Sequence, residues 1–365
     1  MNIEKVNSIA HQLTEDFQKT NLLNLFQKLI STLSQVVSQP NQPQHQTSLS
    51  AIKGQLYDAI DASIVNTMAP SWFEAVNLLK QDVLLGNDLR NKIDAIFADN
   101  TITPASAQEE LQQLFNSTSE IQKGLQNLVA GLDLLDIEED VLADDEYEIS
   151  TLIPRKEIDN TVKGLSKELS EFDFILKHLN ELLGKDSEKY TLRTLSTTDP
   201  LISVIAGINL AVLLGRIVSW VLDQYKKILE IKKLRKELQN NELPEDILEG
   251  IKDYCDKVMT DKIDEFVKQL EREYKSIRDA GRKNEIMNGV RISINKIANR
   301  IDSGFNYEVR MPVLEEPDLE DYEETPEVDP KIVDLQKYRD TLQYRKTTDD
   351  RILSLPEKNI NPDKK

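Results

Sequence analysis

The chain has 365 residues, of which 39% are hydrophobic and only 6% aromatic, and its formal net charge is −19. That length allows two domains, and the composition favours helices over a β-sandwich. The excess of acids argues against general binding to a nucleic-acid backbone, which needs clustered Lys and Arg.

Cysteine usage and the first residues bear on the compartment. Cys255 is the only cysteine, so no disulfide can form within the chain, as is typical of a reducing compartment. The opening stretch MNIEKVNSIAHQLTEDF contains acids and lacks the apolar run of a secretory signal peptide. We therefore expect a cytoplasmic protein.

The N-terminal third alternates helical apolar spacing with polar breaks. We expect residues 1–37 to form an N-terminal helical region and residues 49–132 a small helical bundle. Between them, residues 38–48 (SQPNQPQHQTS) have no apolar anchor and are expected to be a polar linker. Residues 133–146 are acidic and contain no base, so they are expected to be a solvated connection to the next region.

Residues 147–314 combine long helical patterns with three short alternating segments. Residues 147–153, 190–195 and 307–311 alternate as strands do, and the first and third are followed by proline. We expect a long-helix bundle whose short strands cap one end. The predicted fold is mainly α, an elongated antiparallel helical bundle or coiled coil with a few short β-strands.

The first long helix of this region carries an unbroken heptad seam. Its apolar residues are spaced alternately four and three apart, as in a coiled coil. The seam consists of Ile158, Val162, Leu165, Leu169, Phe172, Leu176, Leu179 and Leu183.

The most apolar stretch runs from residue 200 to 225 and continues without a breaker to about residue 239. It predicts one helix of roughly forty residues, about 60 Å long. Small residues recur every four positions, which would place them along one side of this helix and let another helix approach closely. This helix-packing strip consists of Ser203, Gly207, Ala211, Gly215 and Ser219.

A basic stripe follows the apolar stretch, and it has two readings. It is either a solvated face that pairs with acidic neighbours or an anchor at an anionic membrane surface. Its members are Lys226, Lys227, Lys232, Lys233, Arg235 and Lys236. Residues 200–222 approach the length of a membrane span only if Arg216 lies well inside it, which is costly in lipid, so a buried helix in a water-soluble fold is favoured.

Residues 315–365 are expected to be an acidic, largely disordered tail with a short helix near residues 332–342. Elsewhere the chain lacks the motifs of catalysis. His11, His45 and His178 fall in separate elements, and no metal-binding or phosphate-binding spacing is present. Asp223, Glu230 and Lys232 resemble a nuclease set in composition only, because all three would lie on one helix.

We therefore predict no catalytic, cofactor or metal site, and no enzyme. The expected function is a helical scaffold or interaction protein that self-associates or binds a protein partner through coiled-coil-like surfaces. Nucleic acid is not expected as a partner. The alternative is a membrane-active protein, pore-forming or anchored, that inserts the apolar helix 200–222. An enzyme whose site is scattered over several helices is a third, less favoured reading.

Overall fold

The computed structural model divides the chain into two compact units, residues 1–141 and 142–365. Each unit has its own hydrophobic core. The described residues are 3–69, 71–72, 75–76, 84–197, 200–240, 245–274, 280–312, 329–342 and 351–358.

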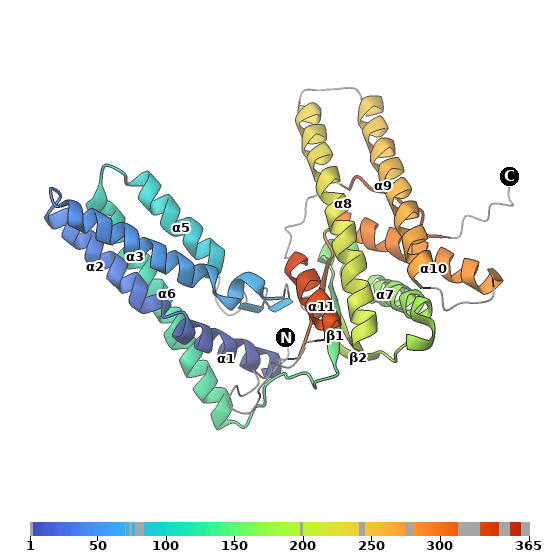
Figure 1. The fold of residues 1–365 in the computed structure, drawn as a ribbon, viewed down its shortest axis with the longest axis horizontal. Coiled ribbons are helices and arrows are strands. Elements are labelled where there is room, and N and C mark those ends of the chain that lie inside the picture. The colour runs from blue at the N-terminus through green and yellow to red at the C-terminus, as the bar shows by residue number, and fades with distance from the viewer. Residues whose placement is uncertain are drawn as a thin grey trace. The chain divides into compact units, whose positions relative to one another are not determined.

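The first unit is helical. It contains α1 (Ile3–Lys19), α2 (Leu22–Ser38), α3 (Pro43–Asp61), α5 (Gly86–Asp99) and α6 (Pro104–Leu134), which pack through apolar faces around residues such as Leu13, Phe26 and Leu111 (Figure 1). A short 3-10 turn, Ile64–Thr67, is tied to α1 because the Asp16 carboxylate accepts hydrogen bonds from the Ser63 hydroxyl and the Ile64 amide.

Two sequence predictions for this unit need correction. The predicted linker 38–48 is reduced to residues 39–42, because α2 ends at Ser38 and α3 begins at Pro43, and proline is well accepted in the first helical turn. The predicted solvated connection 133–146 is partly held against α1. The Asn7 side chain donates to the Ile137 carbonyl (2.6 Å), and the Asp140 amide donates to Ser8 Oγ (2.6 Å).

The second unit contains a four-stranded antiparallel sheet. Its strands are β1 (Tyr147–Leu152), β2 (Thr191–Ser196), β3 (Leu201–Ala206) and β4 (Asn306–Arg310), in the order β2-β3-β1-β4. The three strands expected from alternation are confirmed as β1, β2 and β4. Tyr147 and Ile149 of β1 extend into the core that the helices of this unit share.

Long helices make up most of the second unit. They are α7 (Val162–Leu183), α8 (Ile208–Asn240), α9 (Glu245–Glu273), α10 (Ala280–Asp302) and α11 (Pro330–Thr341). Helices α8 and α9 lie side by side, and α11 packs on α8 (Figure 1). The prediction of a mainly helical fold with a small sheet is therefore confirmed.

The single helix expected from residue 200 onward is wrong at its start. Residues 201–206 (LISVIA) form β3, and α8 begins only at Ile208. A short, fully buried apolar run has no periodicity that separates a strand from a helix. Here β1 pairs with one edge of β3 and β2 with the other, so the backbone hydrogen-bonding groups of residues 201–206 have partners in the sheet.

The tail predicted to be largely disordered, residues 315–365, is described only at residues 329–342 and 351–358, and the rest of that prediction lies outside the described residues. Helix α11 agrees with the short helix expected near residues 332–342, but residues 351–358 are also ordered against the second unit, with Ile352, Leu353 and Leu355 buried. Among the helices of the described residues, none has the length and apolar character that crossing a membrane requires.

Candidate interaction site

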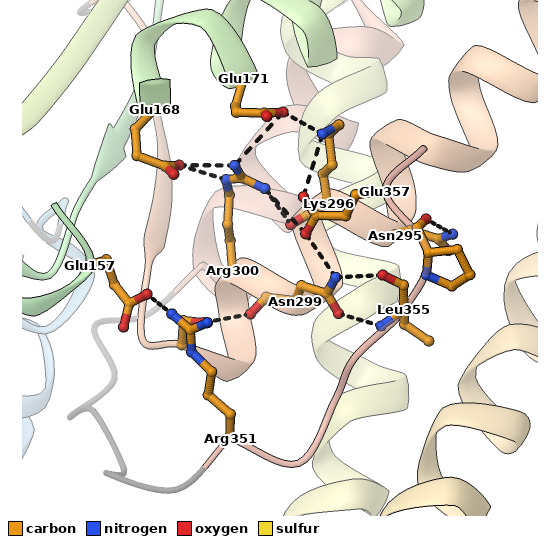
Figure 2. A network of polar contacts seen from close by, with 12 residues as sticks. Glu157, Glu168, Glu171, Asn295, Lys296, Asn299, Arg300, Arg351, Leu355 and Glu357 are labelled. Atoms are coloured by element: carbon orange, nitrogen blue, oxygen red, sulfur yellow. Dashed lines mark hydrogen bonds and ion pairs between the residues drawn. The ribbon is translucent and has the colours of Figure 1, made fainter. Parts of the chain in front are cut away.

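A network of polar contacts surrounds residues 351–358 (RILSLPEK), here called the docked segment. Ile352 is fully buried, and Leu353 and Leu355 are each 4% exposed. Their burial joins the docked segment to the core of this unit. Apolar side chains therefore attach the segment to the core. Figure 2 shows the polar contacts that surround Arg351, Leu355 and Glu357.

Side chains of α9 and α10 bind the backbone of the docked segment. Asp302 Oδ2 accepts hydrogen bonds from the amides of Ile352 (2.7 Å) and Leu353 (2.8 Å). The Leu355 amide and carbonyl both bind the Asn299 amide group, each at 3.0 Å. Main-chain recognition of this kind specifies an extended conformation more than it specifies side chains.

Two further hydrogen bonds complete this backbone recognition. Asn295 Nδ2 donates to the Pro356 carbonyl (2.8 Å), and Asp256 Oδ1 of α9 accepts from the Ser354 amide (2.7 Å). We call Asp256, Asn295, Asn299 and Asp302, together with Glu157 and Lys296, the docking surface.

The spacing of the α10 residues matches an extended peptide. Asn295, Asn299 and Asp302 are four and three positions apart, so they lie along one side of the helix. From Asp302 back to Asn295 the helix rises about 10 Å. The four peptide residues that they bind lie between Ile352 and Pro356, a comparable length of about 13 Å when extended. The docked segment consequently runs antiparallel to α10.

The docked segment is also bound at both ends by charged side chains. Arg351 forms an ion pair with Glu157, which precedes α7. Glu357 accepts from Asn299 Nδ2 (2.8 Å) and lies 3.4 Å from Lys296 Nζ and 3.8 Å from Arg300 Nη1.

Behind Glu357 lies a buried group of ion pairs between α7 and α10 (Figure 2). Arg300, whose side chain is 9% exposed, donates from Nε to Glu168 Oε2 at 2.9 Å, and the Glu168 side chain is 8% exposed. Lys296, 6% exposed, pairs with Glu171. Charges removed from water this far require partners, and each of them has one.

Burial and these charges alter nearby ionisation. Burial raises the pKa of Tyr307 in β4, against the opposing effect of Arg300, so this phenol is neutral throughout the physiological range. Burial also raises the pKa of Asp256, opposed by the hydrogen bond from the Ser354 amide.

The predicted helix-packing strip is divided between two elements. Ser203 lies in β3 and Gly207 precedes α8, whereas Ala211, Gly215 and Ser219 lie on α8. A Cβ at Gly215 would lie 3.3 Å from Tyr338 Cβ and 3.5 Å from Leu335 Cδ1, both of α11. At Gly215, therefore, the neighbour is another helix of the same unit.

The predicted heptad seam is distributed unevenly. Ile158 is buried in the turn before α7, and Val162 at the helix start is 87% exposed. Leu165 and Leu169 are partly buried, while Phe172, Leu176, Leu179 and Leu183 belong to the core. Ile175 and Leu182 are buried with them, so the apolar face of α7 is wider than a two-position seam.

The predicted basic stripe lies along the second half of α8. Lys226 pairs with Asp223 (2.8 Å), and Lys227 and Lys233 are exposed. The side chains of Lys232, Arg235 and Lys236 lie outside the described residues. Asp223, Glu230 and Lys232 are on α8 alone, as expected.

Two other side chains that can be reactive in proteins, those of Cys255 and His178, take part in packing and hydrogen bonding within the second unit. Cys255 is fully buried in the core, and His178 Nδ1 donates to the Phe174 carbonyl (2.8 Å). Within the described ranges, no three His, Cys, Asp or Glu side chains are grouped so that they could hold a metal ion.

Sequence reasoning missed the docked segment. Its signal was the apolar group Ile352, Leu353 and Leu355 directly before Pro356, within an otherwise polar tail. A second signal was the Asn295, Asn299, Asp302 spacing on α10. Comparison of the chain with protein-family models, with curated proteins and with solved structures produces no match.

Proposed function

We propose that this is a non-catalytic interaction protein, which associates with itself or with a protein partner, and that the docking surface of the second unit mediates this association. One observation carries the proposal: four side chains of α9 and α10 bind the backbone of an extended peptide at five consecutive residues, 352–356. Such an arrangement recognises a peptide strand.

The buried charges behind the docking surface support a structural role for the ion pairs between α7 and α10. Arg300 and Lys296 are neutralised by Glu168 and Glu171, which come from α7 and not from the peptide. These pairs hold α7 against α10 and so keep the docking surface in place. Glu357 of the peptide is an additional, weaker partner at 3.4 Å or more from either cation.

The membrane-active alternative has less support. Residues 201–206 of the apolar stretch form β3, an inner strand of the sheet. The residues that follow contribute Leu210, Leu214 and Ile217 to the core of the second unit. Insertion would require the sheet and the core to come apart, so the interaction function is preferred.

A peptide-binding experiment on the full-length protein tests this function. Changing Leu353 and Leu355 to Ser removes two of the three buried apolar side chains of the chain's own segment, retains Ile352, and leaves the docking surface unchanged. A fluorescent RILSLPEK peptide should then bind this variant, measured by anisotropy. The unaltered chain should bind it far more weakly, because a covalently attached competitor acts at an effective concentration on the order of millimolar.

The matched control is the peptide RISSSPEK, which retains the charges and the proline but has lost both leucines. It should bind at least tenfold more weakly than RILSLPEK, about 1.4 kcal/mol. Circular dichroism of the variant should remain that of the unaltered protein. Equal binding of the two peptides, or no binding of either, would contradict the proposed function.

A further inference from the structure

We propose that the ligand of the docking surface is the same segment of a second copy of this chain, so that two chains exchange residues 351–358 and form a closed dimer. This inference rests on the proposed function and names its partner. Each chain would insert its segment into the docking surface of the other.

The chemistry of the site identifies this occupant. The peptide that fits carries a cation at its start, apolar residues at its second, third and fifth positions, a proline at its sixth and an acid at its seventh. The cation meets Glu157, and the acid meets Lys296 and Asn299. Every second copy carries this peptide, with every contact already matched.

The contacts of the docked segment are separable from those of the preceding element. Helix α11 is anchored to α8 through Leu335 and Tyr338, near Gly215. The docked segment instead contacts α9, α10 and Glu157. Eight polar residues, QYRKTTDD, separate Leu342 from Arg351, so α11 can stay in place while the segment binds either its own or another docking surface.

Exchange leaves the number and the kind of contacts unchanged. The same hydrogen bonds form whether the segment comes from the same chain or from a second copy, so the connection and the protein concentration decide between the two. A mutual exchange fills both docking surfaces and leaves no free segment, which closes the assembly with twofold symmetry.

The Arg351–Glu157 pair permits a charge-swap test on the full-length chain. One variant carries Arg351→Glu and a second carries Glu157→Arg. Alone, each places like charges together, both within a chain and in its own exchanged dimer. When the two are mixed, the exchanged heterodimer places the introduced glutamate of one variant against the introduced arginine of the other. It also restores the original pair at the second site.

Native mass spectrometry of the mixture, with a mass tag on one variant, measures the outcome. At about 100 µM the heterodimer should exceed either homodimer by about tenfold. The control is a chain with both changes, in which the pair is restored internally, and it should dimerise as the unaltered chain does. A mixture that stays monomeric, or that contains homodimers and heterodimers in statistical proportion, would overturn the exchange.

A second measurement guards against variants that fold poorly. Sedimentation equilibrium of the unaltered chain, from about 10 µM to about 500 µM, should detect a growing dimer population, since the effective concentration of the attached segment is on the order of millimolar. The variant with Leu353→Ser and Leu355→Ser should remain monomeric. A strictly monomeric unaltered chain across this range overturns the exchange. If RILSLPEK nevertheless binds that variant, the docking function stands and only the second copy is excluded as the partner.

Discussion

Arg300 illustrates how much depends on single side chains in the second unit. Its guanidinium contacts Glu168 at 2.9 Å inside the interface of α7 and α10, and both side chains are less than a tenth exposed. Because little water remains to solvate either charge, the attraction between them contributes little net stability. Removing one partner is nevertheless costly, because the other charge is then buried without a partner.

At this residue scale, Arg300→Met should lower the free energy of unfolding of the second unit by about 3–5 kcal/mol, because Glu168 is left buried without its main partner. Changing Glu168 to Leu in addition should recover a large part of this loss. Urea unfolding monitored by circular dichroism measures both. Arg282→Met, on the exposed side of the same helix, is the matched control and should change little. Equal losses for Arg282→Met and Arg300→Met would contradict this account.

The start of α8 is capped by a side chain that comes from outside the helix. The Glu188 carboxylate, which lies between α7 and β2, accepts hydrogen bonds from the first amides of α8, those of Asn209 (3.3 Å) and Leu210 (3.1 Å). It thus serves as the helix cap that the local sequence does not provide, and its negative charge suits a helix N-terminus. Gly207 leaves the space for this carboxylate.

At the element scale, Gly207→Ala should therefore destabilise the second unit. The added methyl would lie 2.4 Å from the Glu188 carboxyl carbon, which displaces the cap and costs about 1–2 kcal/mol. Gly250→Ala in α9 is the matched control. Nothing lies within 4 Å of its added Cβ, so it should stabilise by about 0.5–1 kcal/mol through helix propensity. Thermal unfolding compares the two variants, and a neutral Gly207→Ala would argue against the cap.

The whole molecule consists of two units with separate cores, 1–141 and 142–365. Phe26 is fully buried in the first core and Ile294 in the second. Since a core residue stabilises the unit that packs around it, loss of either should act on one unit only.

At the scale of the whole chain, Phe26→Ala should therefore lower the free energy of unfolding of the first unit by about 3–5 kcal/mol, and Ile294→Ala that of the second by about 2–5 kcal/mol. Differential scanning calorimetry of the full chain should resolve two transitions, each shifted by only one of the two changes. A single transition that both changes shift together would mean that the units unfold as one.

The local patterns of the sequence predicted most of the helices and three of the strands, but not where α3 and α8 begin. Periodic apolar residues identify α7 and α9, and alternation ending at proline identifies β1 and β4, because those signals depend only on which side of an element is buried. Mainly helical architecture follows from them. The heptad seam on α7 was partly misleading, since a wide apolar face contains a two-position seam within it.

Contacts between residues far apart in the sequence determine β3 and the docked segment, which the local patterns did not predict. Residues 201–206 carry no periodicity, and they became β3 because β1, about fifty positions earlier, and β2 bind both of its edges. The docked segment is similar. Residues 351–358 are too short to form a core of their own, so their apolar side chains are buried in the core of the second unit and their backbone is bound by Asp256, Asn299 and Asp302. The two signals of the site, the apolar group before Pro356 and the spacing of polar residues on α10, lie at least fifty positions apart, and neither identifies the other as its partner. Periodicity therefore located the helices but not the candidate site.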